Sequence, residues 1–434
     1  MKNKIILVIF LILVVVIICS LLFIFVLYDK YKMPEGAKIE INKEDILAYT
    51  ENIKLQDLIK DTNIDIITDD YEIDTKTVGK HTETIEYKYN SIRKYKYDIT
   101  YNVIDTTAPI FISGLSSTYS FYAGETAKNE FEEKIDDITY ADDCDIKPEL
   151  TIEGDIDYTK PGKYNLKIII SDSSGNETAH DIQVTLLKKQ NDNNDSASNN
   201  NQTNKETEKE DTEEDEDEDD GRIAFSDHIK KYKTKNTMVG IDVSKWQEEI
   251  DFEKIKKAGC EFVILRIGVM KDKDSELVKD SNFDKNYKNA KKAGLKVGLY
   301  VYSEANNIDT AISNAEFIID TLDGDKLDLP VSFDWESWTY FNDMEINLHM
   351  LNEMYDAFSE KLEEAGYETM LYASEYYLNN VWLELKDYKI WIAKYSSNYP
   401  EITNGDNQYT FWQCACTGKI DGINGDVDLD IYYK

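Results

Sequence analysis

The sequence predicts a multidomain α/β protein with one transmembrane helix, two β-sandwich domains, an acidic linker and an irregular β/α barrel. Three observations predict this architecture. An uncharged apolar run lies near the N-terminus, residues 35–187 alternate apolar and polar side chains, and strand-like and helix-like segments alternate after position 237. The period of the apolar residues is the main sequence signal that separates strands from helices. The expected domains are 1–34, 35–105, 106–187, 188–236 and 237–434.

The first segment predicts a membrane anchor. Ile5 to Tyr28 contains no charged residue, and its 24 residues would span about 36 Å as a helix, which is enough to cross a bilayer. No small-residue cleavage motif follows the run, so an uncleaved anchor is favoured over a signal peptide. The flanking charges bias the orientation only weakly, and the secreted character of the later domains adds to it. The expected location is therefore the cell membrane, single-pass, with extracellular C-terminal domains.

Residues 35–187 contain an internal repeat. The segment IDTKTVGKH, which starts at Ile73, matches IDYTKPGKY, which starts at Ile156, at an offset of 83 residues. Each copy turns at a glycine and enters an alternating segment that is typical of a hairpin. The join VIDTTAPIF resembles the junction between bacterial immunoglobulin-like domains, and this resemblance implies two sandwiches of that class. The simplest role of these two domains is to act as spacers along the chain, and contact with envelope proteins is an added role.

The linker is strongly acidic. Residues 191–220 contain 14 acidic residues and 2 lysines, a net charge of −12, which is one third of the formal charge of −36 for the chain. A segment this charged and this poor in apolar residues repels itself, so residues 188–236 are predicted to form a disordered tether. The negative charge also excludes nucleic acid as a partner, because that partner needs a basic face.

The cysteines do not form a regular disulfide framework, and free thiols are favoured over a bridge between two of them. Their positions are Cys19, Cys144, Cys260, Cys414 and Cys416. The last two form a C-x-C pair, which is too sparse for zinc without further ligands. No metal and no cofactor is predicted.

The last 200 residues alternate strands with helices, which predicts a parallel sheet covered by helices, here a TIM-like barrel. The expected strands are 238–244, 261–268, 295–303, 329–337, 368–374, 388–395, 409–415 and 426–433. The expected helices are 252–259, 282–294, 309–322 and 346–366. Too few helices separate the later strands, so the barrel should be irregular.

The stretch VSFDWES, from Val331 to Ser337, places Asp334 and Glu336 on either side of a tryptophan. In a strand, residues two apart point to the same face, with Cα atoms roughly 6.5–7 Å apart. Like charges held this close raise the cost of ionising both, so at least one pKa should be raised. An enzyme that needs one acid and one base uses such a pair, although a solvated loop also tolerates it.

Two further strands bring acids to the same end of the barrel. Asp242 ends the run MVGID, and Asp428 lies in the last apolar run beside Asp430. Chemistry in β/α barrels occurs at the C-terminal ends of the strands. The first and last strands of a closed barrel are neighbours, so Asp242 and Asp428 should lie close together. Taken singly, either residue could equally cap a helix.

Aromatic residues follow the same strand ends, at Tyr300, Tyr302, Trp335, Tyr372, Trp391, Tyr395 and Trp412. Acids ringed by aromatics suit a carbohydrate, whose C–H faces stack on rings and whose acetal needs an acid. The residues predicted to bind substrate are Tyr302, Trp335, Tyr372, Trp391, Lys394 and Trp412. Barrel aromatics are also common core residues, which is the structural alternative.

Residues 237–434 resemble the lysozymes of glycoside hydrolase family 25, the Chalaropsis-type N-acetylmuramidases. The segment GIDVSKWQEEIDFEKIKKAGCEFVILRIG is similar to the opening of the family, and FDWES is similar to its D-x-E motif. WIAKY and FWQCACTGKIDGINGDVDLD resemble its closing strands. The resemblance implies a β/α barrel with fewer helices than strands. It also implies hydrolysis of the β-1,4 bond between N-acetylmuramic acid and N-acetylglucosamine in peptidoglycan.

The resemblance also assigns roles to four acids. By position, Glu336 is the general acid, and Asp334 orients the 2-acetamido group of the substrate as the nucleophile. Asp242 and Asp428 complete the acidic quartet. The chain departs from the family at Asp430, where Asn is frequent, and at the two cysteines of the C-x-C pair.

Two other functions stay open on sequence alone. A degenerate barrel would bind cell-wall glycan without cutting it, and a structural stalk would serve mainly as a scaffold for envelope proteins. The presence of all four acids favours the enzyme. The expected partners are therefore peptidoglycan glycan strands and, through the N-terminal helix, the membrane.

Overall fold

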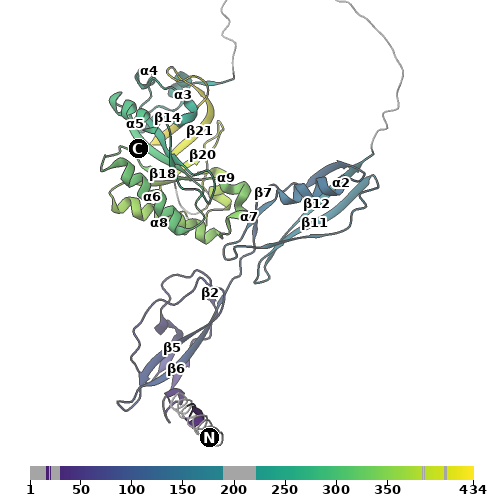
Figure 1. Ribbon diagram of the computed structural model, residues 1–434, viewed down its shortest axis with the longest axis vertical. Helices are drawn as coiled ribbons and strands as arrows, with labels where there is room; N and C mark the ends of the chain where they lie inside the picture. The colour runs from purple at the N-terminus through teal and green to yellow at the C-terminus, as the bar shows by residue number, and fades with distance from the viewer. Residues whose placement is uncertain are drawn as a thin grey trace, which may run out of the picture. The chain divides into compact units, whose positions relative to one another are not determined.

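The computed structural model describes residues 16–18, 20, 30–188, 221–383, 385, 387–404 and 408–434 (Figure 1). The chain divides into two compact units, 1–107 and 108–434. Most of the predicted anchor, and the acidic run at 191–220, lie outside the described residues. Within the described residues, no helix is both long and apolar enough to cross a membrane.

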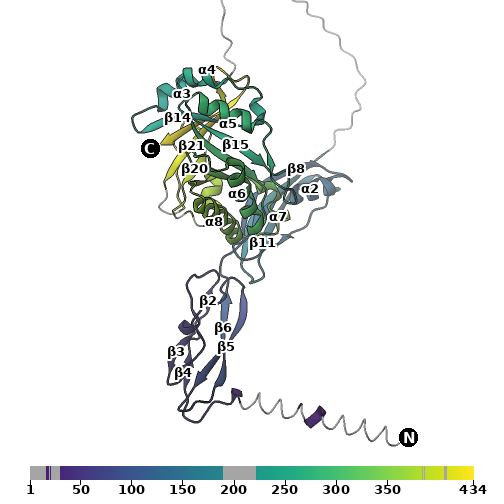
Figure 2. The same ribbon diagram turned by 60° about the vertical axis from the view of Figure 1, so that its left-hand side comes forward.

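The first unit is built on a four-stranded sheet in the order β2-β6-β5-β4, with a separate antiparallel pair of β1 and β3. Its core is formed by side chains such as Leu55, Ile85 and Ile99. Figure 2 shows the long β5–β6 hairpin, which carries the sheet. The elements are β1 (Ile39–Ile41), β2 (Ile46–Leu47), η1 (Leu55–Leu58), β3 (Ile59–Thr62), β4 (Asp65–Ile66), β5 (Gly79–Lys88) and β6 (Tyr95–Ile104).

The second unit begins with a four-stranded sheet in the order β10-β11-β12-β8, plus the pair β7–β9. Phe131 of helix α2 packs in its core with Tyr119 and Ile168. The elements are β7 (Ile110–Ser113), β8 (Thr118–Tyr122), α2 (Ala127–Asp136), β9 (Thr139–Ala141), β10 (Glu149–Glu153), β11 (Gly162–Ser171) and β12 (Glu177–Leu187).

The sequence repeat corresponds to a structural repeat. Strand β5 begins at Gly79 and β11 begins at Gly162, and each strand pairs with the next as an antiparallel hairpin. The two strands have the same length and begin 83 residues apart, which is the offset of the repeat. The second copy carries helix α2, whereas the first has only the short helix η1 in its described part. The assignment of either copy to the immunoglobulin-like class stays a prediction.

The rest of the second unit is organised by eight strands that close into a ring, in the order β14, β15, β17, β18, β19, β20, β21 and β22. Neighbours from β14 to β21 are parallel. The bounds are β14 (Thr237–Val243), β15 (Phe262–Val269), β17 (Lys296–Ser303), β18 (Val331–Trp335), β19 (Thr369–Ser374), β20 (Ile390–Ala393), β21 (Tyr409–Lys419) and β22 (Val427–Tyr433). The short strand β16 (Val278–Lys279) pairs with β15.

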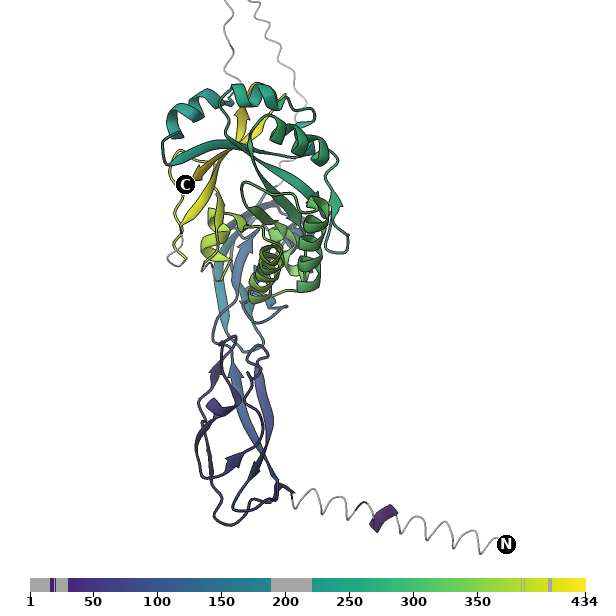
Figure 3. The same ribbon diagram turned by 90° about the vertical axis from the view of Figure 1, so that its left-hand side faces the viewer.

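Strand β22 closes the ring by pairing antiparallel with both β21 and β14. In Figure 3 the yellow end of the chain lies beside the teal β14. This closure departs from the all-parallel TIM plan. The physical reason is the connection 420–426, which is too short for the crossover that a parallel strand would require. The mixed ring is therefore the irregularity that the shortage of helices predicts.

Helices cover the outside of the ring (Figure 1). They connect successive parallel strands, and α6 packs along α8. The helical elements are η2 (Lys245–Gln247), α4 (Phe252–Lys257), α5 (Phe283–Lys292), α6 (Ile308–Leu322), η3 (Ser337–Tyr340), α7 (Phe341–Met344), α8 (Leu348–Glu364) and α9 (Glu375–Asn380). In the described part of the connection from β20 to β21 there is no helix.

Alternation along the strands divides the core into two layers. Phe262, Met370 and Phe411 fill the inside of the ring, whereas Phe333 and its outward-facing equivalents pack against the helices. The inside has no spare room, since a Cβ atom on Gly240 would lie 2.6 Å from the ring of Phe262. The interior is thus a packed core, and functional side chains can gather only at its ends.

The end of the predicted disordered linker is folded, which corrects the expected boundary at 236. Residues Ile223–Ala224 form β13, which pairs with β21, and Phe225–Tyr232 form helix α3. Phe225, His228 and Tyr232 are buried on one face of this helix. The imidazole Nε2 of His228 donates to the carbonyl oxygen of Asp430 at 3.0 Å, and its Nδ1 lies 3.7 Å from the sulfur of Cys414. The helix was missed because an apolar face of two turns is small beside the acidic run.

Replacement of Phe225 by alanine tests this segment. Because Phe225 is only 2% exposed, Phe225→Ala should lower the free energy of unfolding of the barrel by about 3–5 kcal/mol. All 6 tryptophans lie between Trp246 and Trp412, so urea unfolding followed by tryptophan fluorescence reports on this domain alone. Lys230→Ala, an exposed change on the same helix, should have little effect. Equal midpoints for the two variants would mean that the helix does not belong to the domain.

Candidate active site

Strand β18 directs its side chains as the sequence alternation predicts. Phe333 and Trp335 point outward into the helix layer, and Asp334 is buried on the opposite face. The regular strand ends at Trp335, so Glu336 is the first residue beyond it. The side chain of Glu336 is open to solvent. The pair therefore consists of one buried carboxyl and one at the mouth of the ring.

Ring closure brings the other predicted acids together. Asp242 of β14 is the register partner of Asp428 of β22, as the closed-barrel argument predicts. Two residues further along β22, Asp430 is fully buried. Its Oδ1 accepts a hydrogen bond of 2.9 Å from the indole N–H of Trp391. The antiparallel direction of β22 thus presents Asp428 nearer the mouth and Asp430 deeper in the ring.

Gln413, which the sequence argument did not single out, connects these acids to the aromatic residues. Its Nε2 donates to Oδ2 of Asp242 at 2.8 Å. Its Oε1 accepts from the hydroxyl groups of Tyr372 at 2.9 Å and Tyr395 at 2.8 Å. Because the amide uses both its donor and its acceptor, it fixes the orientation of Asp242 and of two tyrosines. The available signal was its place in the strand FWQCACTG, level with the predicted aromatics.

Burial is the main cause of the altered pKa values at this end of the ring. It raises the pKa of Asp242 well above the ordinary value, and the nearby Asp430 carboxyl raises it further. Burial likewise raises the pKa of Asp430 to about 8. Burial, with the neighbouring charge of Asp242, raises the pKa of Asp428 to about 8. At neutral pH the three carboxyls therefore hold protons that isolated carboxyls would have lost.

The Asp334–Glu336 pair is also shifted toward the protonated form. Burial raises the pKa of Asp334 well above its usual value, and the charge of Glu336 adds to this. The positive charge of Arg266 on β15 opposes the shift. Arg266 is itself buried and forms an ion pair of 2.7 Å with Asp280. Partial desolvation, followed by the charge of Glu304, raises the pKa of Glu336.

Three of the predicted substrate-binding residues are buried tryptophans. Trp335 donates its indole N–H to the carbonyl oxygen of Ala305 at 2.8 Å, and Trp412 donates to that of Lys394 at 3.0 Å. The third is Trp391, which bonds Asp430 as described above. The three rings pack in the core around the site, and none of them exposes a face to solvent. Period-two alternation cannot tell an inward ring from an outward one, so the sequence could not separate them.

The remaining predicted residues lie closer to the mouth. Tyr302 is half-buried at the end of β17, where burial, followed by the charges of Glu304, Asp334 and Glu336, raises its pKa. Tyr372 is buried and bonded to Gln413. Lys394 follows β20, and its ammonium forms an ion pair of 2.8 Å with Glu375. Its charge is therefore neutralised by the first residue of α9 rather than by the central acids.

A different group of aromatic side chains is exposed around the mouth. They lie on the segments that follow β14, β18, β19 and β20, which are the C-terminal ends of parallel strands. Among the described residues at this end, the exposed large rings are Trp246, Tyr340, Tyr376, Tyr395 and Tyr399. Of these, only Tyr395 was among the aromatic residues that the sequence argument noted.

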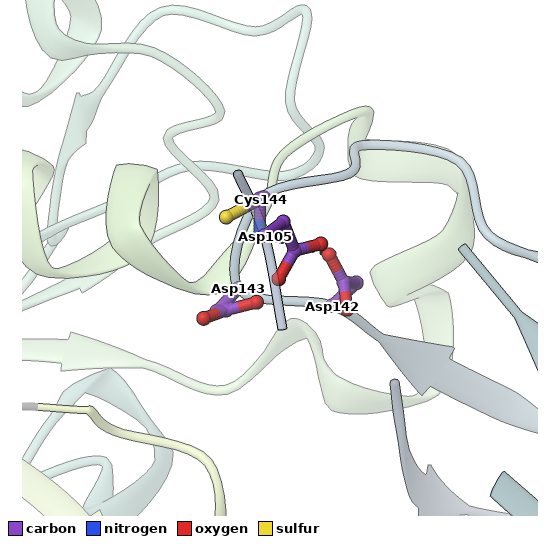
Figure 4. Close-up of side chains that lie close together, drawn as sticks. All are labelled: Asp105, Asp142, Asp143 and Cys144. Atoms are coloured by element: carbon purple, nitrogen blue, oxygen red, sulfur yellow. Dashed lines mark hydrogen bonds between the residues drawn. The ribbon is translucent and has the colours of Figure 1, made fainter. Parts of the chain in front are cut away.

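The cysteines in the described part of the chain are free thiols, as predicted: Cys144, Cys260, Cys414 and Cys416. Cys144 lies on an acidic turn after β9 together with Asp142 and Asp143 (Figure 4). Oδ1 of Asp142 accepts hydrogen bonds from the backbone N–H groups of Cys144 at 2.9 Å and Asp145 at 2.7 Å. This carboxylate therefore braces its own turn, and we assign no ion to it. That the protein needs no metal stays a prediction.

Residues 241–423 match the sequence profile of glycosyl hydrolases family 25. The autolytic lysozyme of Clostridium acetobutylicum is 30% identical over 194 residues, which cover 44% of this chain and 55% of that protein. Lysozyme M1 of Streptomyces globisporus is 26% identical over 201 residues, covering 44% of this chain and 65% of that protein. The similarity thus spans little more than half of the first relative.

Solved structures cover the same part of the chain. The spore cortex lytic enzyme SleM of Clostridium perfringens is 23% identical with a TM-score of 0.40, covering 46% of this chain and 68% of that one. A family 25 glycosyl hydrolase from Bacillus anthracis is 25% identical with a TM-score of 0.39, covering 45% of this chain and 89% of that one.

The pKa of Asp430 predicts a pH-dependent stability. This pKa is about 8 in the folded chain and about 3.9 in an unfolded one. A raised carboxyl pKa stabilises the fold fully below the unfolded value, and this stabilisation is lost as pH rises toward 8. Asp430→Asn keeps an acceptor for Trp391 and does not titrate. It should therefore be more stable than the wild type at pH 8 by on the order of 5 kcal/mol, with the difference vanishing near pH 4.

Urea unfolding at pH 4, 6 and 8 measures this difference. The exposed residue Asp320 on α6 provides a matched control, because Asp320→Asn removes the same charge from a solvated position. A constant difference between Asp430→Asn and wild type at all three pH values would contradict the prediction.

Proposed function

We propose that residues 241–423, a glycosyl hydrolases family 25 domain, hydrolyse the β-1,4 bond between N-acetylmuramic acid and N-acetylglucosamine in peptidoglycan. One observation carries the proposal. Asp334 and Glu336 lie at the end of β18, with Asp242 and Asp428 paired on strands of the same ring. Two carboxyls in different environments are the minimum apparatus of glycoside hydrolysis. The relatives that are named lysozymes support the choice of substrate.

Glu336 is the general acid in this proposal. It is the member of the group that is open to solvent, so a glycosidic oxygen can reach it. Its raised pKa keeps a proton available near neutral pH. The proton passes to the glycosidic oxygen as the bond to C1 breaks, and the leaving sugar departs as a neutral alcohol. Glu336 is then a carboxylate that can take a proton from the incoming water.

Asp334 assists the nucleophile. Its buried carboxyl orients the 2-acetamido group of the substrate, whose carbonyl oxygen attacks C1 and forms a cyclic intermediate. Water opens this intermediate, so the configuration at C1 is retained. Burial favours the protonated form of Asp334 in the empty site. The positive charge that develops on the acetamido nitrogen adds to that of Arg266, so it favours the ionised carboxylate, which is the form that stabilises this charge.

Asp242 and Asp428 complete the site by supplying hydrogen bonds and negative charge around the sugar. Their raised pKa values mean that the empty site holds fewer than its full number of charges at pH 7. A protonated carboxyl donates a hydrogen bond to a sugar hydroxyl, and an ionised one stabilises the oxocarbenium-like transition state.

The exposed aromatic residues at the mouth provide the stacking surface for glycan. Trp246, Tyr340, Tyr376, Tyr395 and Tyr399 present open rings around the acids. Tyr302, Tyr372 and Lys394 contribute from the wall of the site, and the buried tryptophans hold that wall in place. The alternative, a non-catalytic glycan-binding protein or scaffold, would use the same rings and would not need the shifted acids.

The N-terminal half supports a location for this activity. We propose that residues 5–28 anchor the chain in the cell membrane and that the following domains are extracellular. The two β domains and the acidic segment would then place the hydrolase in the wall, with envelope proteins as further partners.

Replacement of Glu336 tests the proposed chemistry. Glu336→Gln is nearly isosteric and has no proton to donate, so release of reducing ends from purified peptidoglycan should fall by about 10²–10⁴-fold. Mass spectrometry of the fragments identifies the bond that is cut. Glu360→Gln, an exposed change on α8, controls for the loss of one charge. Near-normal turnover in Glu336→Gln at an unchanged melting temperature would rule out the assignment.

The proposed anchor is tested on the full-length protein. It should stay in the membrane fraction at high salt and be released only by detergent, because an uncharged run of this length is buried in hydrocarbon. Protease added to wall-stripped cells should remove the barrel. A mature N-terminus beyond Tyr28 would show that the run is a cleaved signal peptide, and protection of the barrel until the cells are permeabilised would invert the orientation.

A further inference from the structure

A sixth carboxyl, Glu304, lies at the same end of the ring and has no part in the acidic quartet. It is the first residue after β17, the neighbour of β18. Ser303 and Trp335 are register partners at the ends of these two parallel strands. Glu304 and Glu336 are therefore the residues that follow the two strands. Strands in a sheet lie about 4.8 Å apart. The register therefore places Glu304 beside the proposed general acid.

Hydrogen bonds connect Glu304 and its neighbour to both residues that flank Glu336. The hydroxyl of Ser337 donates to Oε2 of Glu304. On the other side, the indole N–H of Trp335 donates to the carbonyl oxygen of Ala305 at 2.8 Å. The acid is thus held from the residue before it and from the residue after it, in both cases by the segment 304–305.

The side chain of Glu304 is 9% exposed, so its charge is little screened by water. Burial raises its pKa, whereas hydrogen bonds from Ser337 and Tyr302 oppose this shift and favour the ionised form. A carboxylate held in this way exerts a negative potential on the two catalytic carboxyls next to it, and its charge acts on both Glu336 and Asp334.

Other groups around Glu336 also contribute to its potential, from several elements of the ring. They are Asp242 on β14, Tyr302 on β17, Asp334 on β18, Tyr372 on β19, Tyr377 on α9 and Asp428 on β22, whereas Arg266 on β15 acts on Asp334. Glu304 differs from the other carboxyls of this group because it is also bonded to the segment that positions Glu336. Its charge and its contacts therefore act on the same residue.

We propose that Glu304 is a positioning residue for Glu336, which holds the turn after the acid through Ser337 and keeps the acid protonated through its own negative charge. The inference rests on the proposed role of Glu336 as general acid. A purely structural Glu304 would affect folding and would leave the protonation of Glu336 unchanged.

Glu304→Gln separates the two possibilities. The amide keeps an oxygen that can accept from Ser337 and removes only the charge. Loss of a like charge should lower the midpoint at which Glu336 titrates by about one pH unit. The alkaline limb of kcat/KM should then move about one unit lower, and the plateau at low pH should be kept. At pH values above this shifted limb, kcat/KM of Glu304→Gln should be about tenfold below that of the wild type.

The titration of Glu336 is measured directly by carbon NMR on the full chain, with ¹³C in the glutamate side-chain carboxyls and Glu336→Gln used to assign the signal. Glu304→Asp, which restores a charge, should return the midpoint toward that of the wild type. Asp309→Asn, an exposed change in the first turn of α6, should leave the midpoint unchanged.

The outcomes distinguish this inference from the proposed function. A lower midpoint in Glu304→Gln supports the inference, and an unchanged midpoint in a folded variant overturns it, whether or not the wild type cuts peptidoglycan. Wild-type turnover tests the function separately. If Glu304→Gln does not fold, the test rests on Glu304→Asp, whose kcat/KM should have an alkaline limb near that of the wild type. A uniform loss of kcat/KM at every pH in Glu304→Asp would overturn the inference.

Discussion

The structure of the C-terminal domain depends on the antiparallel insertion of β22 between β14 and β21. Without this strand the parallel sheet would have two open edges, and unpaired strand edges are a liability in water. The same strand carries Asp428 and Asp430 into contact with the first strand of the ring. One closing interaction therefore completes the hydrogen-bond network of the barrel and assembles half of the acidic site.

The accumulation of carboxyls at one end of the ring has an electrostatic cost that the surrounding groups reduce. Gln413 and Trp391 donate to acidic oxygens, and Arg266 supplies a buried positive charge nearby. The remaining cost is met by protonation, because burying several like charges without partners is far less favourable than binding protons. The site is thus a set of coupled acids whose protons are held in common.

Much of this arrangement could be predicted from sequence, for identifiable reasons. Alternation in VSFDWES placed Asp334 on the face opposite Trp335, and the neighbouring positions of first and last strands placed Asp242 beside Asp428. Gln413, Arg266 and Glu304 were missed because their roles come from contacts between strands distant in sequence, which no local pattern encodes. The buried tryptophans looked like ligand-binding residues because a strand end does not reveal which face is covered. The roles of these residues toward a substrate stay predictions.

The folded segment that precedes β14 has a mechanical consequence. A pull on the chain from the N-terminal side would enter the domain at β13, whose two residues pair with Gly418 and Lys419 of β21, and would then load the buried face of α3. These two elements would have to yield before tension reached β14 and Asp242. The segment would therefore unfold first under load, and the geometry of the acids would be protected from tension applied along the chain.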